Sequence, residues 1–320
     1  MASIEYIAGF IDGEGHVSIA RIPRRNRSHE YCVRLSITNT NRQILEEIRK
    51  SWGGHLATVS VRKPGWKRSY VLVWTNAAAG RLLAEVAPYL RVKSRQAVAL
   101  RSSLDHIHGC RRRRNKRGQL LPLSPRDMEI REVFYSRLRS LNRRGPGAAI
   151  HSDAEGGDKS IYRLPGLGYL AGFVDAEGSL MIAKSTDRRY RRPHYRARIS
   201  IGNTDRAVLE DLRRTYGGIL ANQPSREVGW KDAYQLVWTN GMIDWILPRL
   251  SLHLRIKRRQ AQVLMDFVRH VRGTRQGRQG KNGRFFAPLP AEIIAQREAF
   301  RGLMRQLNAK GTSPSARART

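Results

Sequence analysis

The sequence predicts an α+β fold built from two pseudo-symmetric domains, and three observations lead to this prediction. The acidic string Ile7–Gly15 returns almost unchanged as Leu170–Gly178. Other landmarks follow both copies at nearly constant spacing, as an internal repeat requires. Within each half, the patterns run helix, strand, strand, helix, strand, strand, helix. This order is typical of domains in which helices cover one face of an antiparallel sheet and leave the other face open.

The repeat covers most of the chain. The 320 residues, 40% of them hydrophobic, suffice for two domains that each bury a core. We expect an N-terminal domain (1–142), a linker rich in Gly and small polar residues (143–166), a C-terminal domain (167–308) and a flexible tail (309–320). The matching landmarks are Asn39-Thr40 with Asn203-Thr204, Gly53-Gly54 with Gly217-Gly218, Gly65-Trp66-Lys67 with Gly229-Trp230-Lys231, Trp74-Thr75-Asn76 with Trp238-Thr239-Asn240, and Leu90–Ala97 with Leu254–Ala261.

The first half opens with an expected helix from Ile4 to Gly13. Apolar residues recur there at helical spacing, and Gly15 supplies the stop. Two strands follow, and Tyr31–Thr38 shows the alternation of apolar and polar residues that a half-buried strand requires. Tyr195–Ile201 repeats this alternation in the second half.

The remaining elements of the unit follow in order. Asn39 or Asn41 caps a helix that runs through Trp52, after which Gly53-Gly54 turns the chain into a strand. The next strand and the closing helices are expected at Tyr70–Thr75, after the Pro64-Gly65 break, and at Ala77–Tyr89 and Ser94–His106; a terminal helix is expected within Leu121–Asn142 and again within Ala287–Asn308.

Charge indicates the class of partner. The chain carries 60 Lys and Arg against 26 Asp and Glu, a formal net charge of +34, and its sequence pI is near 11.4. This excess favours a partner rich in phosphate, so nucleic acid is expected. A membrane partner is disfavoured, because the sequence has neither an apolar stretch of about 18 residues nor a basic amphipathic helix with a wholly apolar face.

Basic and hydroxyl side chains gather on the polar faces of the expected strands and in the turns beside them. A strand pair fits the DNA major groove, which displays a different donor and acceptor pattern for each base pair. Simple solvation is the alternative for any single arginine. The candidate DNA-binding residues are Arg21, Arg34, Ser36, Arg62, Lys67, Arg196, Arg198, Ser200, Arg226 and Lys231.

The repeated acidic string predicts a joint between the halves. Gly9 and Gly13, like Gly172 and Ala176, are spaced to share one helical face, so two such helices can pack closely around a pseudo-two-fold axis. Two glutamates, Glu14 and Glu177, would then converge at the C-terminal ends of the helices. Helix dipoles and mutual repulsion disfavour negative charge there, so the pair needs cations. Mg²⁺, a hard ion that prefers oxygen ligands and also binds phosphate, is the expected one.

The string has a simpler interpretation, and the role of its aspartates is open. A single copy would be read as an exposed helix end, with Gly15 or Gly178 as an ordinary cap; finding both copies with the same small-residue face favours a site. Asp12 and Asp175 have three open roles, which are support of the metal site, capping of backbone groups, and pairing with neighbouring cations.

Cysteine usage adds little chemistry. Only Cys32 and Cys110 are present, so no disulfide framework is expected and a reducing compartment is compatible. His106 and His108 lie close to Cys110 in sequence, but this spacing is not a usual zinc pattern. Structural zinc is therefore not expected.

On these residues the chain resembles the LAGLIDADG homing endonucleases in their single-chain, two-repeat form. The resemblance implies that the paired motif helices form the domain interface and that the two antiparallel sheets form a DNA-binding saddle. It implies that Glu14 and Glu177 bind the divalent metal, together with Gly13 and Ala176. It also implies that Asn39 and Asn203 orient solvent, and that Lys93 and Lys257 assist at the scissile phosphate. Glu replaces the family's commoner Asp, and the extra methylene could alter metal geometry.

The activity that the resemblance implies is site-specific hydrolysis of one phosphodiester in each DNA strand. Metal-bound water would attack phosphorus, with Mg²⁺ as the cofactor and Mn²⁺ or Ca²⁺ as other ions able to bind. Cutting across the minor groove would leave short 3′ overhangs. Two sheets that each cover about one helical turn suggest a loosely palindromic target of roughly 20 bp. The chain is expected to act as a monomer.

Two alternatives remain from other functional classes. One is an RNA-binding maturase that assists splicing of its host intron, although Trp66, Trp74, Trp230 and Trp238 recur with the fold and read as packing residues rather than base-stacking ones. The other is a DNA-binding regulator, which would not require both carboxylates. The basic inserts Arg111–Arg117 and Arg272–Arg284 are expected to touch phosphate backbone, or to be solvated loops.

The expected location is the cytoplasm or nucleoid of a bacterium or archaeon, because abundant Arg and Ala suggest a G·C-rich genome. The start of the chain reads as neither a signal peptide nor a transit peptide. Coding by an organelle is the alternative.

Overall fold

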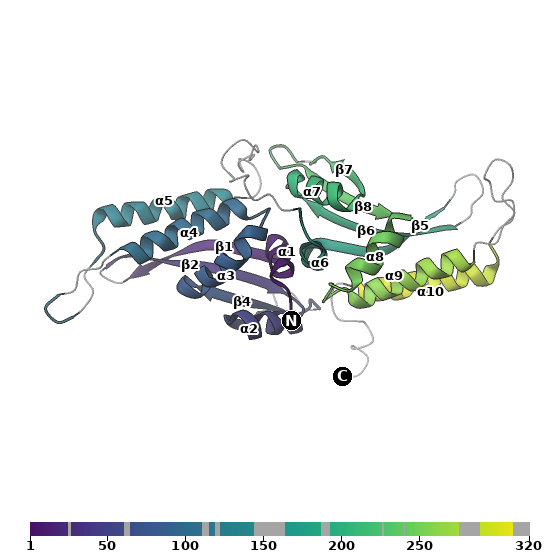
Figure 1. Cartoon of the computed structure of the whole chain (residues 1–320), viewed down its shortest axis with the longest axis horizontal. Helices are drawn as coiled ribbons and strands as arrows, with labels where there is room; N and C mark the ends of the chain where they lie inside the picture. The colour runs from purple at the N-terminus through teal and green to yellow at the C-terminus, as the bar shows by residue number, and fades with distance from the viewer. Residues whose placement is uncertain are drawn as a thin grey trace.

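The computed structural model describes residues 1–24, 27–60, 65–110, 115–118, 122–143, 164–186, 193–225, 227–239, 241–274 and 289–309. Most of the predicted linker, of the tail and of the basic inserts lies outside these residues, as do the candidates Arg62 and Arg226. Figure 1 shows two similar halves side by side, with helices α1 and α6 meeting at the centre.

The first half has the predicted order of helices and strands. Its elements are α1 (Ile4–Glu14), β1 (Gly15–Arg24), β2 (Arg27–Asn39), α2 (Arg42–Trp52), β3 (His55–Val59), β4 (Ser69–Thr75), α3 (Asn76–Val86), the 3₁₀ turn η1 (Ala87–Tyr89), α4 (Ser94–Gly109) and α5 (Pro125–Leu141). The second half repeats the order with α6 (Leu167–Glu177), β5 (Gly178–Thr186), β6 (Pro193–Asn203), α7 (Arg206–Tyr216), β7 (Ile219–Gln223), β8 (Ala233–Thr239), α8 (Gly241–Ser251), α9 (Arg258–Gly273) and α10 (Ala291–Leu307).

Each half contributes one antiparallel sheet of four strands. The strand orders are β1-β2-β4-β3 and β5-β6-β8-β7. Alternate residues of the strands point to a face covered by helices, since α3, α4 and α5 pack on β1 and β2, and α8, α9 and α10 pack on β5 and β6. This face holds the core, for example Val33, Leu35 and Trp74, which are at most 1% exposed. We call the opposite side of each sheet its open face.

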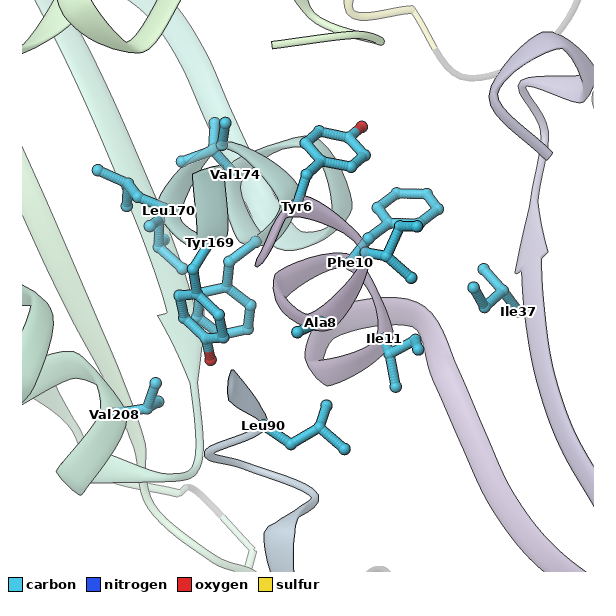
Figure 2. Packing of buried hydrophobic residues seen from close by; sticks show 14 of the residues in the cluster. Tyr6, Ala8, Phe10, Ile11, Ile37, Leu90, Tyr169, Leu170, Val174 and Val208 are labelled. Atoms are coloured by element: carbon cyan, nitrogen blue, oxygen red, sulfur yellow. The ribbon is translucent and has the colours of Figure 1, made fainter. Parts of the chain in front are cut away.

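Helices α1 and α6 form the joint between the halves. Gly9 and Gly172 lie where the helices cross: a Cβ on Gly9 would stand 2.1 Å from the carbonyl oxygen of Tyr169, and one on Gly172 would stand 2.0 Å from that of Tyr6. Only glycine lets the two backbones approach this closely. Figure 2 shows the helix pair, with Tyr6 and Tyr169 on opposite sides of the crossing. The small-residue face predicted from the sequence is therefore confirmed.

The start of α2 agrees with an expected signal, whereas the end of α1 differs from the expected one. Asn41, not Asn39, caps α2, because its side chain accepts a hydrogen bond from the backbone N–H of Ile44. Gly15 does not act as a left-handed cap, since its backbone is extended (φ −74°, ψ 152°) and already begins β1. Glycine is required there for another reason: a Cβ would stand 2.5 Å from the carbonyl oxygen of Ile11.

Two ion pairs also link the halves. Arg91 reaches Asp211 of α7 at 3.5 Å, and Arg255 reaches Glu47 of α2 at 2.9 Å. All four side chains are mostly shielded from solvent, with 7–28% of their surface exposed. Both arginines belong to the segments that precede α4 and α9, so these segments reach across to the opposite half.

No helix among the described residues is both long and apolar enough to cross a lipid bilayer.

Candidate active site and nucleic-acid interface

The close helix crossing brings the two glutamates together. A Cβ on Gly13 would stand 2.3 Å from the Cβ of Ala176 and 3.1 Å from the Cγ of Glu177. The side chain of Glu177 therefore lies against the last turn of α1, where Glu14 ends that helix. Glu14 is half-buried, whereas Glu177 is exposed. Two carboxylates thus meet at adjacent helix C-termini.

Burial and the neighbouring charges shift the pKa values of Glu14 and Lys257. Burial, followed by the nearby Glu177 carboxylate, raises the pKa of Glu14, while Lys257 and Lys93 oppose the rise. Burial lowers the pKa of Lys257, against the pull of Asp175, Glu14 and Glu177. Negative charge at Glu14 is therefore held at a cost to the fold, as is usual where carboxylates are prepared for a ligand.

A stability measurement can detect that cost. Below the ordinary pKa of 4.5, Glu14 is protonated in the folded and unfolded chains alike. Between that value and the raised folded value, the unfolded chain loses its proton more readily, so stability falls as pH rises. We expect Glu14→Gln to raise the melting temperature at pH 8 in EDTA, and the gain to vanish below about pH 4. The helix-dipole contribution alone is about 0.3–1 kcal/mol. A lower melting temperature for the variant at pH 8 would contradict the expectation.

Asp12 and Asp175 prove to be capping residues for backbone groups, one of the three roles left open by the sequence. The carboxylate of Asp12 accepts hydrogen bonds from the backbone N–H groups of Arg91 (2.7 Å), Val92 (3.2 Å) and Lys93 (2.9 Å). Asp175 does the same for the corresponding segment of the second half, at 2.7, 3.0 and 2.9 Å; its donors are Arg255, Ile256 and Lys257. Each aspartate thus fixes the segment that carries the lysine of its own half.

The two lysines lie beside the glutamates. The Nζ of Lys93 donates to the carbonyl oxygen of Asp12, and the Nζ of Lys257 donates to those of Val174 (2.9 Å) and Asp175. Both amines are therefore at the C-terminal ends of the motif helices, and both contribute positive charge at Glu14. The structure brings together Glu14, Glu177, Lys93 and Lys257, as the sequence predicted.

Asn39 and Asn203 lie at the inner ends of β2 and β6. Ile37 pairs with Gly15, so Asn39 extends two residues past the start of β1, on the side of Glu14. Its Oδ1 accepts the backbone N–H of Asn41 at 2.8 Å, and Asn203 makes the same contact with Asp205 at 2.8 Å. Both side chains thus shape a turn before a helix.

The donor set at the helix ends fits a hard divalent cation. The final hydrogen bond of α1 joins the N–H of Gly15 to the carbonyl of Ile11, so the carbonyl of Gly13 lies beyond the last helical acceptor. Ala176 holds the same place in α6, whose cap N–H bonds to Val174. Oxygen ligands of this kind suit Mg²⁺, which commonly takes one or two carboxylates plus phosphate oxygens. Within the described ranges, His, Cys, Asp and Glu form no cluster of three or more able to hold a metal.

The open faces carry five of the predicted DNA-binding residues. Arg34 pairs with Ser18 and Thr75, and Ser36 pairs with His16 and Val73. In the second half, Arg196, Arg198 and Ser200 take the corresponding alternate positions of β6. Arg34 and Arg196 are exposed, whereas the small Ser36 and Ser200 are buried between longer neighbours.

The other described candidates lie elsewhere. Arg21 points to the helix-covered side, with Val17 and Ile19, and forms an ion pair with Glu132 of α5 at 3.4 Å. Its position near the outer end of β1 explains this, because a long side chain there reaches the terminal helix. Lys67 and Lys231 lie in the β3–β4 and β7–β8 turns rather than on a sheet, and Lys67 donates to the carbonyl of Ala309 at 2.9 Å.

Sequence reasoning missed a polar cluster on the second open face. Arg198 donates to Gln235 at 2.7 Å, and Gln223 donates to the same amide oxygen at 3.1 Å, so one cluster spans β6, β8 and β7. The first half has Val71 at the position of Gln235, since Val71 pairs with Thr38 as Gln235 pairs with Gly202. Gln235 lies between Tyr234 and Leu236 in the sequence, and this alternation is the signal that could have placed it on this face. Gln223 lies between Asn222 and Pro224 and has no such signal.

The tryptophans divide into two classes. Trp74 and Trp238 are buried, each 1% exposed, as the sequence predicted. Trp66 and Trp230 are 61% and 49% exposed, so these two are not core residues. They follow Gly65 and Gly229, whose φ values are 83° and 81°, in the β3–β4 and β7–β8 connections.

Comparison with known proteins places the fold. No family model and no curated protein matches the sequence, whereas solved structures match along nearly the whole chain. A structure of the LAGLIDADG homing endonuclease I-SmaMI bound to cleaved DNA has a TM-score of 0.70 at 16% identity, covering 97% of this chain and 99% of that one. I-SmaMI bound to uncleaved DNA target in the presence of calcium ions gives 0.65 at 15% identity, covering 95% and 99%. I-GzeII in complex with its DNA target gives 0.64 at 14% identity, covering 94% and 97%. The chain therefore has the two-domain fold of LAGLIDADG homing endonucleases.

Proposed function

We propose that the protein is a site-specific endonuclease that cuts both strands of double-stranded DNA. The observation that carries this proposal is the convergence of Glu14 and Glu177 at adjacent helix ends, with Lys93 and Lys257 beside them. A protein that only binds DNA does not need two carboxylates where they repel its partner's phosphates. The net charge of +34 and the basic open faces supply the complementary attraction for the DNA backbone.

The pseudo-symmetry of the site supports one cut per strand. Each half provides one glutamate and one lysine, and the joint between α1 and α6 relates the two sets. A divalent cation, with Mg²⁺ as the proposed ion, supplies Lewis acidity and an activated water when bound. Glu14 and Glu177 would hold it, with the carbonyls of Gly13 and Ala176. Asn39 and Asn203 would orient solvent, and Lys93 and Lys257 would offset the negative charge that develops on the phosphate.

The open faces would choose the DNA sequence. Strands in the major groove can present Arg to guanine and Gln to adenine, and Arg198, Gln235 and Gln223 form such a set in the second half. The first half has Val71 in place of Gln235, and this apolar side chain suits the methyl group of thymine better. The target is therefore proposed to be loosely palindromic, about 20 bp long, and cut by a monomer to leave short 3′ overhangs.

Arg198→Ala provides a test of this reading of the open face. We expect the variant to relax preference at one base pair in one half of the target, at a cost of about 1–3 kcal/mol against the best base. The matched control is Arg249→Ala, which removes the same charge from α8, where Arg249 lies over the ring of Trp245. That variant should weaken binding at all sequences alike. Selection from a randomised library measures both, and an unchanged preference in Arg198→Ala would contradict the assignment.

The proposed function itself is tested by incubating the protein with Mg²⁺ and a large randomised duplex library, then sequencing the cut ends. Staggered breaks at one long sequence, lost when EDTA replaces Mg²⁺, would support the proposal. Absence of cutting in both Mg²⁺ and Mn²⁺ would overturn it.

RNA binding is the second candidate, and the exposed Trp66 and Trp230 favour it. Aromatic side chains beside Lys67 and Lys231 can stack on unpaired bases. Tight and selective binding to a structured intron RNA, lost in the double variant Trp66→Ala and Trp230→Ala, would support the maturase role. Equal affinity for unrelated RNA of the same length would speak against it.

A further inference from the structure

The segments that carry the two lysines are held from both halves of the molecule. Arg91–Lys93 is hydrogen-bonded to Asp12 of its own half, as described above, and Arg255–Lys257 to Asp175. Each aspartate also accepts a hydrogen bond from the opposite half. Tyr169 of α6 donates its hydroxyl to Asp12 at 2.8 Å, and Tyr6 of α1 donates to Asp175 at 2.8 Å. The two hydrogen bonds therefore cross the joint in opposite directions.

The crossed contacts are buried and reinforced. Asp12 and Asp175 are each 2% exposed, and Tyr6 and Tyr169 are each 1% exposed, so water cannot replace a lost partner readily. Burial, aided by the neighbouring carboxylates, raises the pKa values of both tyrosines, so each hydroxyl keeps its proton and remains a donor. The guanidinium of Arg91 also lies over the ring of Tyr169, 5.9 Å from its centre.

From this geometry we infer that Tyr6 and Tyr169 are positioning residues, each fixing the lysine of the opposite half through the aspartate that holds its segment. Tyr169 acts through Asp12 on Lys93, and Tyr6 acts through Asp175 on Lys257. The inference rests on the proposed function only for its catalytic consequence. The hydrogen-bonded hold on residues 91–93 and 255–257 is itself a property of the protein without DNA.

Without its tyrosine, an aspartate loses one of the four hydrogen bonds that its carboxylate accepts and can turn away from the segment above it. Lys93 depends on this orientation through its backbone N–H, which bonds to the side chain of Asp12, while its Nζ bonds to the backbone carbonyl of the same residue. The other half keeps its own set of contacts. Each tyrosine therefore governs one of the two lysines and leaves the other in place.

Hydrogen exchange of the free protein tests the hold directly. Tyr169→Phe should speed amide exchange at residues 91–93 by about tenfold, equivalent to about 1.4 kcal/mol, and leave residues 255–257 unchanged. Tyr6→Phe should do the reverse. The matched control is Tyr216→Phe, which removes a hydroxyl donated to the carbonyl of Pro165 at 2.6 Å and touches neither aspartate. Faster exchange in both segments alike, or in neither, overturns the inference.

Strand-resolved cleavage tests the consequence. On a duplex with a different dye on each strand, Tyr169→Phe should slow one strand and Tyr6→Phe the other, so that nicked duplexes of opposite polarity accumulate. A general loss of stability would slow both strands equally, and that result overturns the positioning role. If the unaltered protein cuts no DNA, the proposed function fails, and the exchange measurement alone still decides whether the crossed hold exists.

Discussion

Glu14→Gln and Glu177→Gln are each expected to abolish double-strand cleavage while DNA binding persists. Gln keeps the size of the side chain but removes a charged oxygen, so the divalent cation of the proposed mechanism would lose one of its two carboxylates. Losing several kcal/mol of metal-dependent stabilisation lowers the rate by about a thousandfold or more, at about 1.4 kcal/mol per factor of ten. Single-turnover cleavage in Mg²⁺ and a binding titration in Ca²⁺ measure the two properties separately.

The matched control for this prediction is Glu85→Gln. Glu85 is an exposed residue of α3, away from the helix joint, and the substitution makes the same change of charge. Its cleavage rate should equal that of the unaltered protein. A glutamate variant that cuts both strands at the normal rate would remove that carboxylate from the proposed chemistry.

Gly172→Ala is expected to be among the most damaging substitutions for stability. Its Cβ would stand 2.0 Å from the carbonyl oxygen of Tyr6 and 2.9 Å from the backbone nitrogen of Phe10, so backbone atoms of α1 would have to move. Overpacking a core costs about 1–3 kcal/mol, and a clash between two backbones lies at the upper end or beyond. Separating the helices would also pull Glu14 and Glu177 apart. Chemical denaturation measures the loss of free energy of unfolding.

Gly302→Ala is the matched control. Gly302 lies within α10, and no atom stands within 4 Å of the position that its Cβ would take. Alanine there should raise stability by about 0.5–1 kcal/mol, because it favours the helix. If Gly172→Ala lowers the free energy of unfolding and Gly302→Ala raises it, the contact between α1 and α6 is the cause of the loss. Equal effects at both positions would show that the α1–α6 crossing is looser than described.

Much of the fold follows from local patterns. The helical spacing of Ile4, Ile7, Ala8 and Ile11 predicted α1 to within one residue, and the alternation from Tyr31 to Thr38 predicted the centre of β2. The repeat then carried both results to the second half. The joint between α1 and α6 was predictable as well. Small residues four apart lie on one face of a helix and allow the backbone of a second helix to approach closely.

Contacts between distant segments were less predictable. The roles of Asp12 and Asp175 stayed open because their partners, the segments before α4 and α9, lie far away in sequence. No signal in the sequence indicated the roles of Tyr6 and Tyr169 either, because each contacts an aspartate of the opposite half. Arg21 was assigned to the DNA-binding set by its charge, whereas its strand position turns it toward Glu132. The net charge predicts the class of partner, and the position of a residue in its strand determines whether its side chain can contact that partner.

The pseudo-symmetry of the joint has a consequence for assembly. Arg91 pairs with Asp211, and Arg255 pairs with Glu47, yet Asp211 and Glu47 hold equivalent places in the repeat. A complex of two identical halves would thus find the same kinds of contacts as the mixed pair. The covalent connection favours pairing of the two different halves, because it raises the local concentration of each half around the other to about the millimolar range. Separated halves, expressed together, should therefore form a mixture of homodimers and heterodimers.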